Sequence, residues 1–408
     1  MVESDAHFER ADQAVGLLPL DLRRLTDPDL FERGDQYALW RRLRDNDHVA
    51  WTSEPDGPGF WLVTRYDDGV RVLKDAALFS AARGTLLDAN HWEDDPAAGK
   101  MLALMDPPRH TDVRHVLAPF FTQRGIAVIE AKTFGYVRAL VRHGSGLGEF
   151  DFAEEIAAQL PINVTLDILD IPRSDWDLLA GMIDTPAEFR DGAISNGEML
   201  MYFSELAARR RTRPGNDPLS ALLTSEVDGR RLTDEEAILS FANVFMAGLY
   251  TTLLAAAGGL DVLLHQPEHW ATLHDNPELI PIAVEEMLRW TSPVQVFYRT
   301  ALADVNVGGR TIRRHERVAV WLPSLNRDER VFTEPEVFEL ARTPNRHVAF
   351  GAGAHTCLGA LLARLELRLL FREMLEKWKG VVSAGRARRI QAINLEGVNR
   401  LPVSVVAA

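Results

Sequence analysis

The sequence predicts a mainly α-helical protein with a small β portion, organised as a single domain over residues 1–408. Helical hydrophobic patterns dominate residues 106–290 and return at 358–379. Strand-like composition is concentrated in residues 45–70 and 294–323 and in short segments near the C-terminus. No Gly/Ser-rich or Pro-rich linker divides the chain, and apolar residues make up 46% of it, enough for one large core.

The first hundred residues combine helix and strand signals. Residues 39–43 have a helical pattern, whereas residues 49–51 and 60–64 have the composition of strands. Between the two strands lies a turn signal at 55–57, which contains Pro and Gly. We therefore expect the two strands to pair.

The most informative element is a helix predicted from Thr233 to His265. Thr233 and Glu236 form a capping-box signature at its start, and Pro267 marks its end. From the rise per residue of an α-helix, it should be roughly 50 Å long, enough to cross the whole molecule. Its centre, residues 241–260, is apolar on nearly every side, which predicts that it is buried.

A shorter helix is predicted over residues 277–290, and strand composition follows with a turn at 308–309. Residues 326–344 are irregular and interrupted by prolines. This irregular segment leads into the loop that carries the only cysteine of the chain.

The composition argues against several classes of protein. A net charge of −14 disfavours general nucleic-acid binding, which needs a basic surface. A single cysteine allows no intrachain disulfide, which fits a reducing compartment. No long apolar run predicts a membrane span, and the polar, acidic start lacks the pattern of a signal peptide. We therefore expect a cytoplasmic protein with no membrane and no nucleic-acid partner.

The single cysteine, Cys357, lies in a glycine-rich loop just before a helical pattern that begins at Leu358. The loop, residues 350–359, reads Phe-Gly-Ala-Gly-Ala-His-Thr-Cys-Leu-Gly. A helix N-terminus and inward-pointing backbone N–H groups both stabilise a thiolate. A thiolate held this way is a metal ligand or a nucleophile, whereas a lone cysteine is more often a buried structural residue.

The loop resembles the heme-binding loop of the cytochrome P-450 superfamily, F-G-x-G-x-H-x-C-x-G, at every fixed position. The resemblance covers most of the chain and is to the soluble bacterial members. It implies a cytochrome P-450 fold that binds heme b (iron protoporphyrin IX) between the long central helix and the cysteine loop with its following helix. It also implies that Cys357 ligates the iron. Four other loop residues are expected to contact the cofactor: Phe350, Gly351, His355 and Gly359.

Glu286 and Arg289 lie three residues apart on the predicted helix. Alone they would form an exposed ion pair worth a few tenths of a kcal/mol. Apolar residues are predicted on the same helical face: Leu279, Ile282 and Trp290. The pair resembles the family's E-x-x-R signature, in which a second arginine from the irregular segment completes a structural triad. Arg342 matches that arginine, and we expect the triad to brace the cysteine loop.

Residues 106–114 resemble the family's D-P-P-x-H-x-x-x-R segment. His110 and Arg114 are four residues apart, so both can reach from one helical face. Heme carries two propionates, and a buried carboxylate demands charge-assisted hydrogen bonds. By the same resemblance, Arg299 and His355 are the other expected propionate partners.

The centre of the long helix, residues 247–252, resembles the family pattern A/G-G-x-D/E-T-T. Gly248 costs about 1 kcal/mol relative to Ala inside a helix. We expect its missing side chain to let the helix approach the heme and to leave room for dioxygen. In the family, the threonine matching Thr251 orders the protons used in oxygen activation, and Thr252 follows it. Tyr250 stands where the family has an acid, so an easily ionised relay is lost.

Tyr250 leaves several interpretations open. Thr251 and water suffice for hydroxylation, or another acid substitutes for the missing one. Alternatively, the enzyme performs less proton-demanding work such as oxidative coupling, nitration or dehydrogenation. A non-catalytic interpretation makes Tyr250 a core aromatic that faces away from the heme.

The resemblance implies a heme-thiolate monooxygenase that receives two electrons from a ferredoxin and its ferredoxin reductase, because the chain has no flavin or iron–sulfur domain. We expect it to hydroxylate a small organic substrate of secondary metabolism, free or tethered to a carrier protein. A non-catalytic heme sensor would not need Thr251 beside Gly248, and a cysteine hydrolase would need a His/Asp partner set. Substrate contacts are expected in segments 81–103 and 189–203 and at Val244, Ala247, Val294, Val296, Phe297 and Val398.

Overall fold

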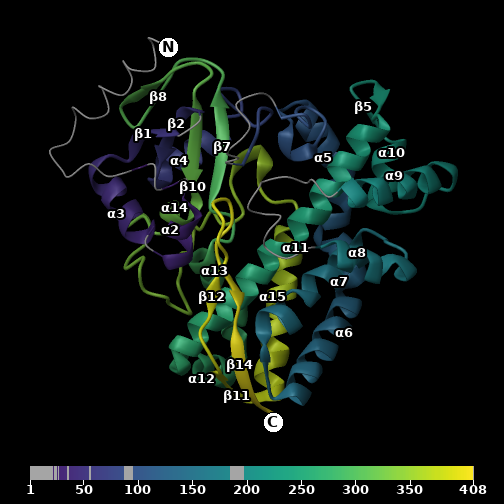
Figure 1. Cartoon of the computed structure of the whole chain (residues 1–408), viewed down its shortest axis with the longest axis vertical. Helices are drawn as coiled ribbons and strands as arrows, with labels where there is room; N and C mark the ends of the chain where they lie inside the picture. Colours follow the sequence, from purple (N-terminus) through teal and green to yellow (C-terminus); the bar gives the residue numbers. More distant parts are fainter. Residues whose placement is uncertain are drawn as a thin grey trace.

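The computed structural model describes residues 22, 25, 27–34, 36–54, 57–86, 95–183 and 197–407. It confirms the predicted class, mainly α-helical with a small β portion (Figure 1). The α-helices are α2 (Pro28–Arg33), α3 (Gln36–Asn46), α4 (Tyr66–Lys74), α5 (Arg109–Phe121), α6 (Gln123–Leu147), α7 (Gln159–Ile168), α8 (Trp176–Met182), α9 (Gly197–Thr212), α10 (Pro218–Thr224), α11 (Asp234–His265), α12 (Pro267–Asp275), α13 (Ile280–Thr291), α14 (Leu322–Leu325) and α15 (Ala360–Lys377).

The strands are short and fall into one larger sheet and several small ones. They are β1 (Val49–Glu54), β2 (Gly57–Val63), β3 (Phe79–Ser80), β4 (Glu149–Asp151), β5 (Glu226–Val227), β6 (Arg230–Arg231), β7 (Val296–Ala301), β8 (Val305–Val307), β9 (Arg310–Ile312), β10 (Arg317–Trp321), β11 (Trp378–Ser383), β12 (Arg388–Arg389), β13 (Val398–Arg400) and β14 (Pro402–Ala407).

The five-stranded sheet has the order β1-β2-β10-β7-β3 and lies beside α2, α3 and α4 (Figure 1). β1 and β2 pair antiparallel, with Ala50 opposite Leu62. The turn predicted between them at 55–57 has residues 55 and 56 outside the described part of the chain. β10 joins β2 in parallel, and β7 then pairs antiparallel with β10, so that Val318 lies opposite Arg299. The sheet thereby brings Arg299 to the border of the helical part.

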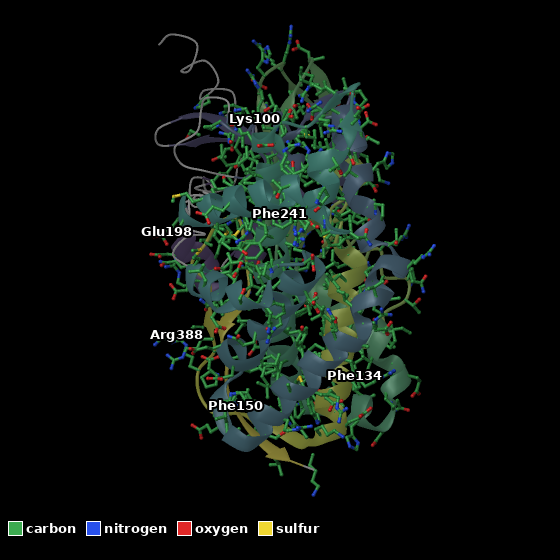
Figure 2. The ribbon with its side chains drawn as sticks, turned by 90° about the vertical axis from the view of Figure 1, so that its right-hand side faces the viewer. Lys100, Phe134, Phe150, Glu198, Phe241 and Arg388 are labelled. Carbon is green, nitrogen blue, oxygen red and sulfur yellow. The ribbon has the colours of Figure 1, made fainter. Side chains whose placement is uncertain are left out.

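The long helix α11 runs through the middle of the molecule (Figure 1). Its capping box forms: the Glu236 N–H donates to Thr233 Oγ1 over 3.2 Å, and the Thr233 N–H donates to the Glu236 carboxylate over 2.8 Å. α11 is long and apolar enough to cross a membrane, but half of its most apolar stretch is buried inside the protein. Figure 2 shows Phe241 of this helix inside the molecule, whereas Glu198 and Arg388 point outward. A buried core position explains the apolar composition.

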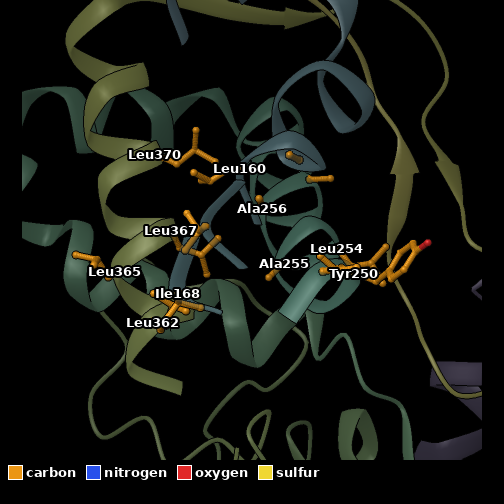
Figure 3. Packing of buried hydrophobic residues seen from close by; sticks show 14 of the residues in the cluster. Leu160, Ile168, Tyr250, Leu254, Ala255, Ala256, Leu362, Leu365, Leu367 and Leu370 are labelled. Atoms are coloured by element: carbon orange, nitrogen blue, oxygen red, sulfur yellow. The ribbon is translucent and has the colours of Figure 1, made fainter. Parts of the chain in front are cut away.

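α15, which follows the cysteine loop, packs against α6, α13 and α11, and Figure 3 shows it beside α11. Leucines of α15 approach small residues of α11 and Leu160 of α7 in one hydrophobic cluster. The labelled members of this cluster on the two long helices include Leu362, Leu365, Leu367, Leu370, Ala255 and Ala256. This packing fixes the start of α15, and therefore the cysteine loop, relative to α11.

Candidate active site

The cysteine loop, residues 350–359, ends at the N-terminus of α15. Gly351 and Gly353 have φ values of 71° and 78°, which glycine adopts without steric cost. A side chain at Gly353 would also lie 2.6 Å from the backbone oxygen of Leu73 on α4. The loop therefore needs glycine at 353 both for its turn and for its close approach to α4.

Cys357 lies at the end of this loop, where its backbone N–H donates to the Phe350 carbonyl over 2.9 Å. Desolvation by the surrounding protein raises the pKa of the thiol above its ordinary value, although the side chain is exposed to the cavity that it borders. A hydrogen bond from the Gly359 backbone N–H and the charges of Arg114 and Arg364 lower the pKa, but only in part. A cation bound at the sulfur would lower the pKa further and favour the thiolate.

A cavity of about 710 Å³ lies in front of Cys357. One wall is α11, where bordering residues repeat at intervals of three and four: Val244, Ala247, Gly248 and Thr251. The opposite wall is the cysteine loop and the start of α15. The apolar composition of residues 241–260 predicted that this stretch is buried. One of its faces instead borders the cavity.

The residues predicted to hold the propionates all border the cavity. The rings of His110 and His355 lie 3.9 Å apart between centroids. His110 Nδ1 and His355 Nε2 are buried, and neither has a hydrogen-bond partner in the described part of the chain. Burial lowers the pKa of His110 to about 4 and that of His355 to about 3. These rings are therefore neutral near pH 7.

Arg299 borders the same edge and is only 3% exposed. Its guanidinium donates to the Tyr298 carbonyl over 2.6 Å, and no described carboxylate forms a salt bridge with it. Burial lowers the pKa of Arg299 to about 10. Asp106 attracts Arg299 but forms no salt bridge with it. A buried cation with no carboxylate in direct contact is costly, so an anionic partner at this edge would stabilise it.

These observations fit heme. Two carboxylate groups at this edge would satisfy the unpartnered ring nitrogens and the arginine charge, and Cys357 faces the same cavity as a ligand for iron. The residues that would hold the propionates are His110, Arg114, Arg299 and His355.

The catalytic segment of α11 also borders the cavity. Thr251 Oγ1 donates to the Ala247 carbonyl over 3.0 Å, and Thr252 is buried beside it. A side chain at Gly248 would lie 2.6 Å from Oγ1 of Thr165 on α7. Glycine at position 248 therefore allows α7 to pack closely against α11. The sequence alone did not reveal this reason for the glycine. The expected role of Gly248 in leaving room for dioxygen stays a prediction.

Tyr250 borders the cavity and belongs to the buried hydrophobic cluster. Figure 3 shows its phenol pointing away from α15, the helix that follows the cysteine loop. This orientation favours the interpretation of Tyr250 as a core aromatic over that of a proton relay.

Sequence analysis missed Glu366 on α15. This carboxyl is 3% exposed and borders the cavity together with Thr251 and Thr252. Its Oε2 has no hydrogen-bond partner among the residues that the structure describes, and burial raises its pKa to about 8. The sequence did contain a signal for Glu366: it is an acid on the leucine-rich stripe of α15. Such a position predicts a buried carboxyl, and carboxyls are rarely buried without a role.

The predicted triad comes together in a buried position on α13. Glu286 accepts from Arg289 over 2.7 and 2.8 Å and from Arg342 over 3.0 and 3.1 Å. Arg289 also donates to backbone carbonyls of the irregular segment, including that of Pro335. Ile282, which we expected on the same face, is 40% exposed. Leu279 and Trp290 of the predicted stripe do pack against the core, and the irregular segment that covers the pair completes its burial.

Four of the six expected substrate residues border the large cavity: Val244, Ala247, Val294 and Phe297. Val296 does not, because alternation along β7 points it into the core cluster of Trp321. Val398 borders a second, smaller cavity instead. Polar and apolar cavity residues that we did not expect include Leu239, Asn243, Asn394 and Leu395.

The two expected substrate segments differ. In segment 81–103, residues 83–86, 95–97 and 101–103 border the cavity. Residues 87–94 of this segment lie outside the described part of the chain. Of segment 189–203, residues 189–196 lie outside it as well, and the described residues of α9 do not border the cavity.

Comparison with known proteins agrees with this geometry. The Cytochrome P450 family model matches residues 158–398. Putative cytochrome P450 126 of Mycobacterium tuberculosis is 35% identical, covering 96% of this chain and 99% of that protein. Linalool 8-monooxygenase of Pseudomonas putida is 31% identical, with coverages of 94% and 98%. The crystal structure of CYP108D1 from Novosphingobium aromaticivorans matches with a TM-score of 0.87 at 29% identity, covering 96% of this chain and all of that one.

The sequence matches extend over most of the chain, and the fold places its one cysteine at a cavity bordered by the buried basic residues His110, Arg299 and His355. The chain therefore belongs to the cytochrome P450 family of heme-binding monooxygenases.

Proposed function

We propose that this monooxygenase hydroxylates a small, largely apolar organic compound of secondary metabolism. When bound, heme supplies the redox chemistry that activates dioxygen. The observation that carries the proposal is that two threonines of α11 and the buried carboxyl of Glu366 border one cavity with Cys357. Hydroxylation needs protons delivered at the site of oxygen activation, and these groups are able to hold them.

Glu366 supports the interpretation in which another acid substitutes for the residue replaced by Tyr250. A pKa of about 8 keeps its carboxyl protonated at neutral pH, so that Oε2 holds a proton inside the cavity. Thr251 and Thr252 supply hydroxyls that can pass a proton onward, directly or through water. Tyr250 favours a second candidate, an atypical oxidation such as coupling, nitration or dehydrogenation, only if Glu366 proves dispensable.

A ferredoxin with its reductase is the proposed electron source. The whole chain carries a charge of −14, yet exposed cations stand beside the cysteine loop. A side chain at Gly353 would lie 2.7 Å from Cα of Lys74, which places the end of α4 on the loop. Lys74 is exposed, as are Arg71 on the same helix and Arg346, four residues before the loop. Exposed cations close to the loop on an acidic protein suit an acidic donor, and electron transfer should weaken as salt rises.

The same proposal extends to the place and form of the substrate. We propose that the reaction takes place in the cytoplasm. A solved structure 27% identical to this chain is that of P450BioI in complex with an acyl carrier protein ligated to a fatty acid. Tethered delivery is therefore the alternative to a free substrate, and a comparison of free and carrier-bound forms of one candidate decides between them.

The test begins with the reduced, carbon-monoxide-bound absorption spectrum, which should show thiolate ligation in the wild type and lose it in Cys357→Ser. Substrates that shift the iron spin state are then turned over with ferredoxin, its reductase and isotope-labelled dioxygen. Hydroxylation incorporates one labelled oxygen atom into the product. Coupled or dehydrogenated products without label favour the atypical oxidase. Electron supply that oxidises nothing across a broad panel favours a heme sensor.

A further inference from the structure

The segment 394–398 forms a thin partition between two cavities. Asn394 and Leu395 border the large cavity in front of Cys357. Gly397 and Val398 border the second cavity, which measures about 220 Å³. A short stretch of chain therefore has the substrate space on one side and free volume on the other.

Glu396 lies in the middle of this partition and is 1% exposed. The Tyr37 hydroxyl of α3 and the Arg389 guanidinium of β12 both donate to its Oε1. Burial, followed by the charge of Glu396, raises the pKa of Tyr37 to about 12, so the phenol remains a donor at any working pH. A buried carboxylate is held strongly by such partners, because its charge has no access to water.

The partition has further contacts on two sides: the Ile390 N–H, just after β12, donates to the Gly397 carbonyl over 2.9 Å, and other bonds run to the segment before β7. The Glu396 N–H donates to the Pro293 carbonyl over 2.8 Å, and the Gln295 side chain donates to the Leu395 carbonyl over 3.1 Å. Val294 forms a single β-bridge with Leu395. These bonds attach the two ends of the partition, and the carboxylate of Glu396 ties its middle to Tyr37 of α3 and Arg389 of β12, which both border the smaller cavity.

We propose that Glu396 is a positioning residue that fixes the wall formed by Asn394 and Leu395 and thereby limits the size of the substrate. The inference rests on the proposed function of the large cavity as the substrate site. With the tie to Tyr37 and Arg389 intact, the wall is held in place. Without it, the wall has about 220 Å³ of space into which it can retreat, so larger molecules enter the substrate site.

The test uses full-length, heme-loaded protein and two probes that share an imidazole ligand but differ in bulk, imidazole and the triphenyl-substituted clotrimazole. Dissociation constants come from spectral titration. In Glu396→Gln, the affinity for clotrimazole relative to imidazole should rise about tenfold, because only the bulky probe meets the wall. Glu329→Gln is the matched control, since Glu329 also pairs with an arginine, Arg44, but borders neither cavity, and its ratio should stay that of the wild type.

Tyr37→Phe serves as a second variant, because it removes the hydrogen bond to Glu396 and the longer one (3.4 Å) from Arg389, and keeps the ion pair between Arg389 and Glu396. It should shift the ratio in the same direction by a smaller factor, about threefold. A ratio unchanged from the wild type in both variants, or shifted towards imidazole, overturns the inference. The reduced carbon-monoxide spectrum of each variant separates this failure from that of the proposed function, since a wild type without thiolate ligation would invalidate the substrate site itself.

Discussion

Two buried glutamates on helices that flank the cysteine loop have opposite surroundings. Glu286 on α13 is fully buried and accepts hydrogen bonds from two arginines, an asparagine side chain and a backbone N–H. Glu366 on α15 is 3% exposed, borders the large cavity, and has an Oε2 without a partner in the described chain. The chain fully satisfies the group that holds the fold together. It leaves unsatisfied the group that faces the site of chemistry.

The same contrast separates the arginines. Arg289 and Arg342 neutralise Glu286 and donate to backbone carbonyls. Arg299 is as deeply buried but has no described carboxylate in salt-bridge contact. The buried glutamate and arginines of the triad are thus completed by the protein, whereas at the large cavity Glu366 Oε2 has no described partner and Arg299 has no described carboxylate in salt-bridge contact.

The largest expected effect is the stability difference between matched glutamate variants. Glu286→Gln should lower the free energy of unfolding by about 3–5 kcal/mol, because it leaves Arg289 and Arg342 buried without a counterion. Glu366→Gln should not lower it, because a carboxyl that must stay protonated in the fold at neutral pH is replaced by a neutral amide of the same shape. Urea unfolding of both variants measures the difference. Equal losses would show that the two carboxyls are held alike.

Arg299→Leu should weaken heme retention roughly 10- to 100-fold, as expected for loss of a charge-assisted bond worth about 1.5–3 kcal/mol. The heme-free protein should be no less stable than the wild type, since an unpaired buried charge is removed. The heme-to-protein absorbance ratio after gel filtration and unfolding of the apoprotein give the two values. Arg289→Leu is the control, and it should destabilise the apoprotein.

The pH dependence of stability should differ in sign between two acids. Glu236, at the start of α11, accepts from Arg230, Arg109 and the Thr233 N–H, and the Arg230 hydrogen bond is the main cause of a pKa lowered to about 2. The folded pKa lies below the unfolded one, so this stability is present above about pH 4.5 and is lost as pH falls towards 2, by at most about 3 kcal/mol.

Burial raises the pKa of Glu366 to about 8, above its unfolded value. Its protonated form therefore favours the fold most at low pH, and stability falls as pH rises from about 4.5 through 8. Unfolding of the apoprotein as a function of pH should have a shallower acid-side slope in Glu236→Gln, where Glu285 with its pKa of about 2 still contributes, and should lose the neutral-side slope in Glu366→Gln. Slopes that survive both substitutions unchanged would assign the titrations to other groups.

Local signals in the sequence were sufficient for much of the architecture. Thr233 and Glu236 form a capping box through bonds between near neighbours, and Gly351 and Gly353 of the cysteine loop have the positive φ values that a tight turn requires. The faces of elements were harder, because burial depends on what a distant segment covers. Ile282 is exposed, and Val296 faces another core cluster, although both belong to correctly placed elements.

Long-range juxtapositions could not be read from the pattern. Glu366 is one acid on a helix with several, and only the packing of α15 against α11 brings it to the cavity. The partition at Asn394 and Leu395 depends on β12, β13 and α3 meeting, elements separated by about the length of the chain. Val398 was expected to contact the substrate, but it lies on the other side of that partition and borders the smaller cavity.

The smallest expected effect concerns Gly248, and it tests whether glycine is needed there for packing against α7 or for ligand space in the cavity. Gly248→Ala gains about 1 kcal/mol of helix propensity, but its Cβ would lie 2.6 Å from Thr165 Oγ1, an overlap that costs about 1–3 kcal/mol. We expect a net loss near 1 kcal/mol, removed when Thr165→Ala is added, as a double-mutant cycle in urea would show. If the second substitution restores stability but not the binding of carbon monoxide, then glycine is needed on both faces. If Gly248→Ala impairs neither stability nor carbon monoxide binding, α7 shifts at little cost to accommodate the new Cβ. Glycine is then required at position 248 neither for packing against α7 nor for ligand binding.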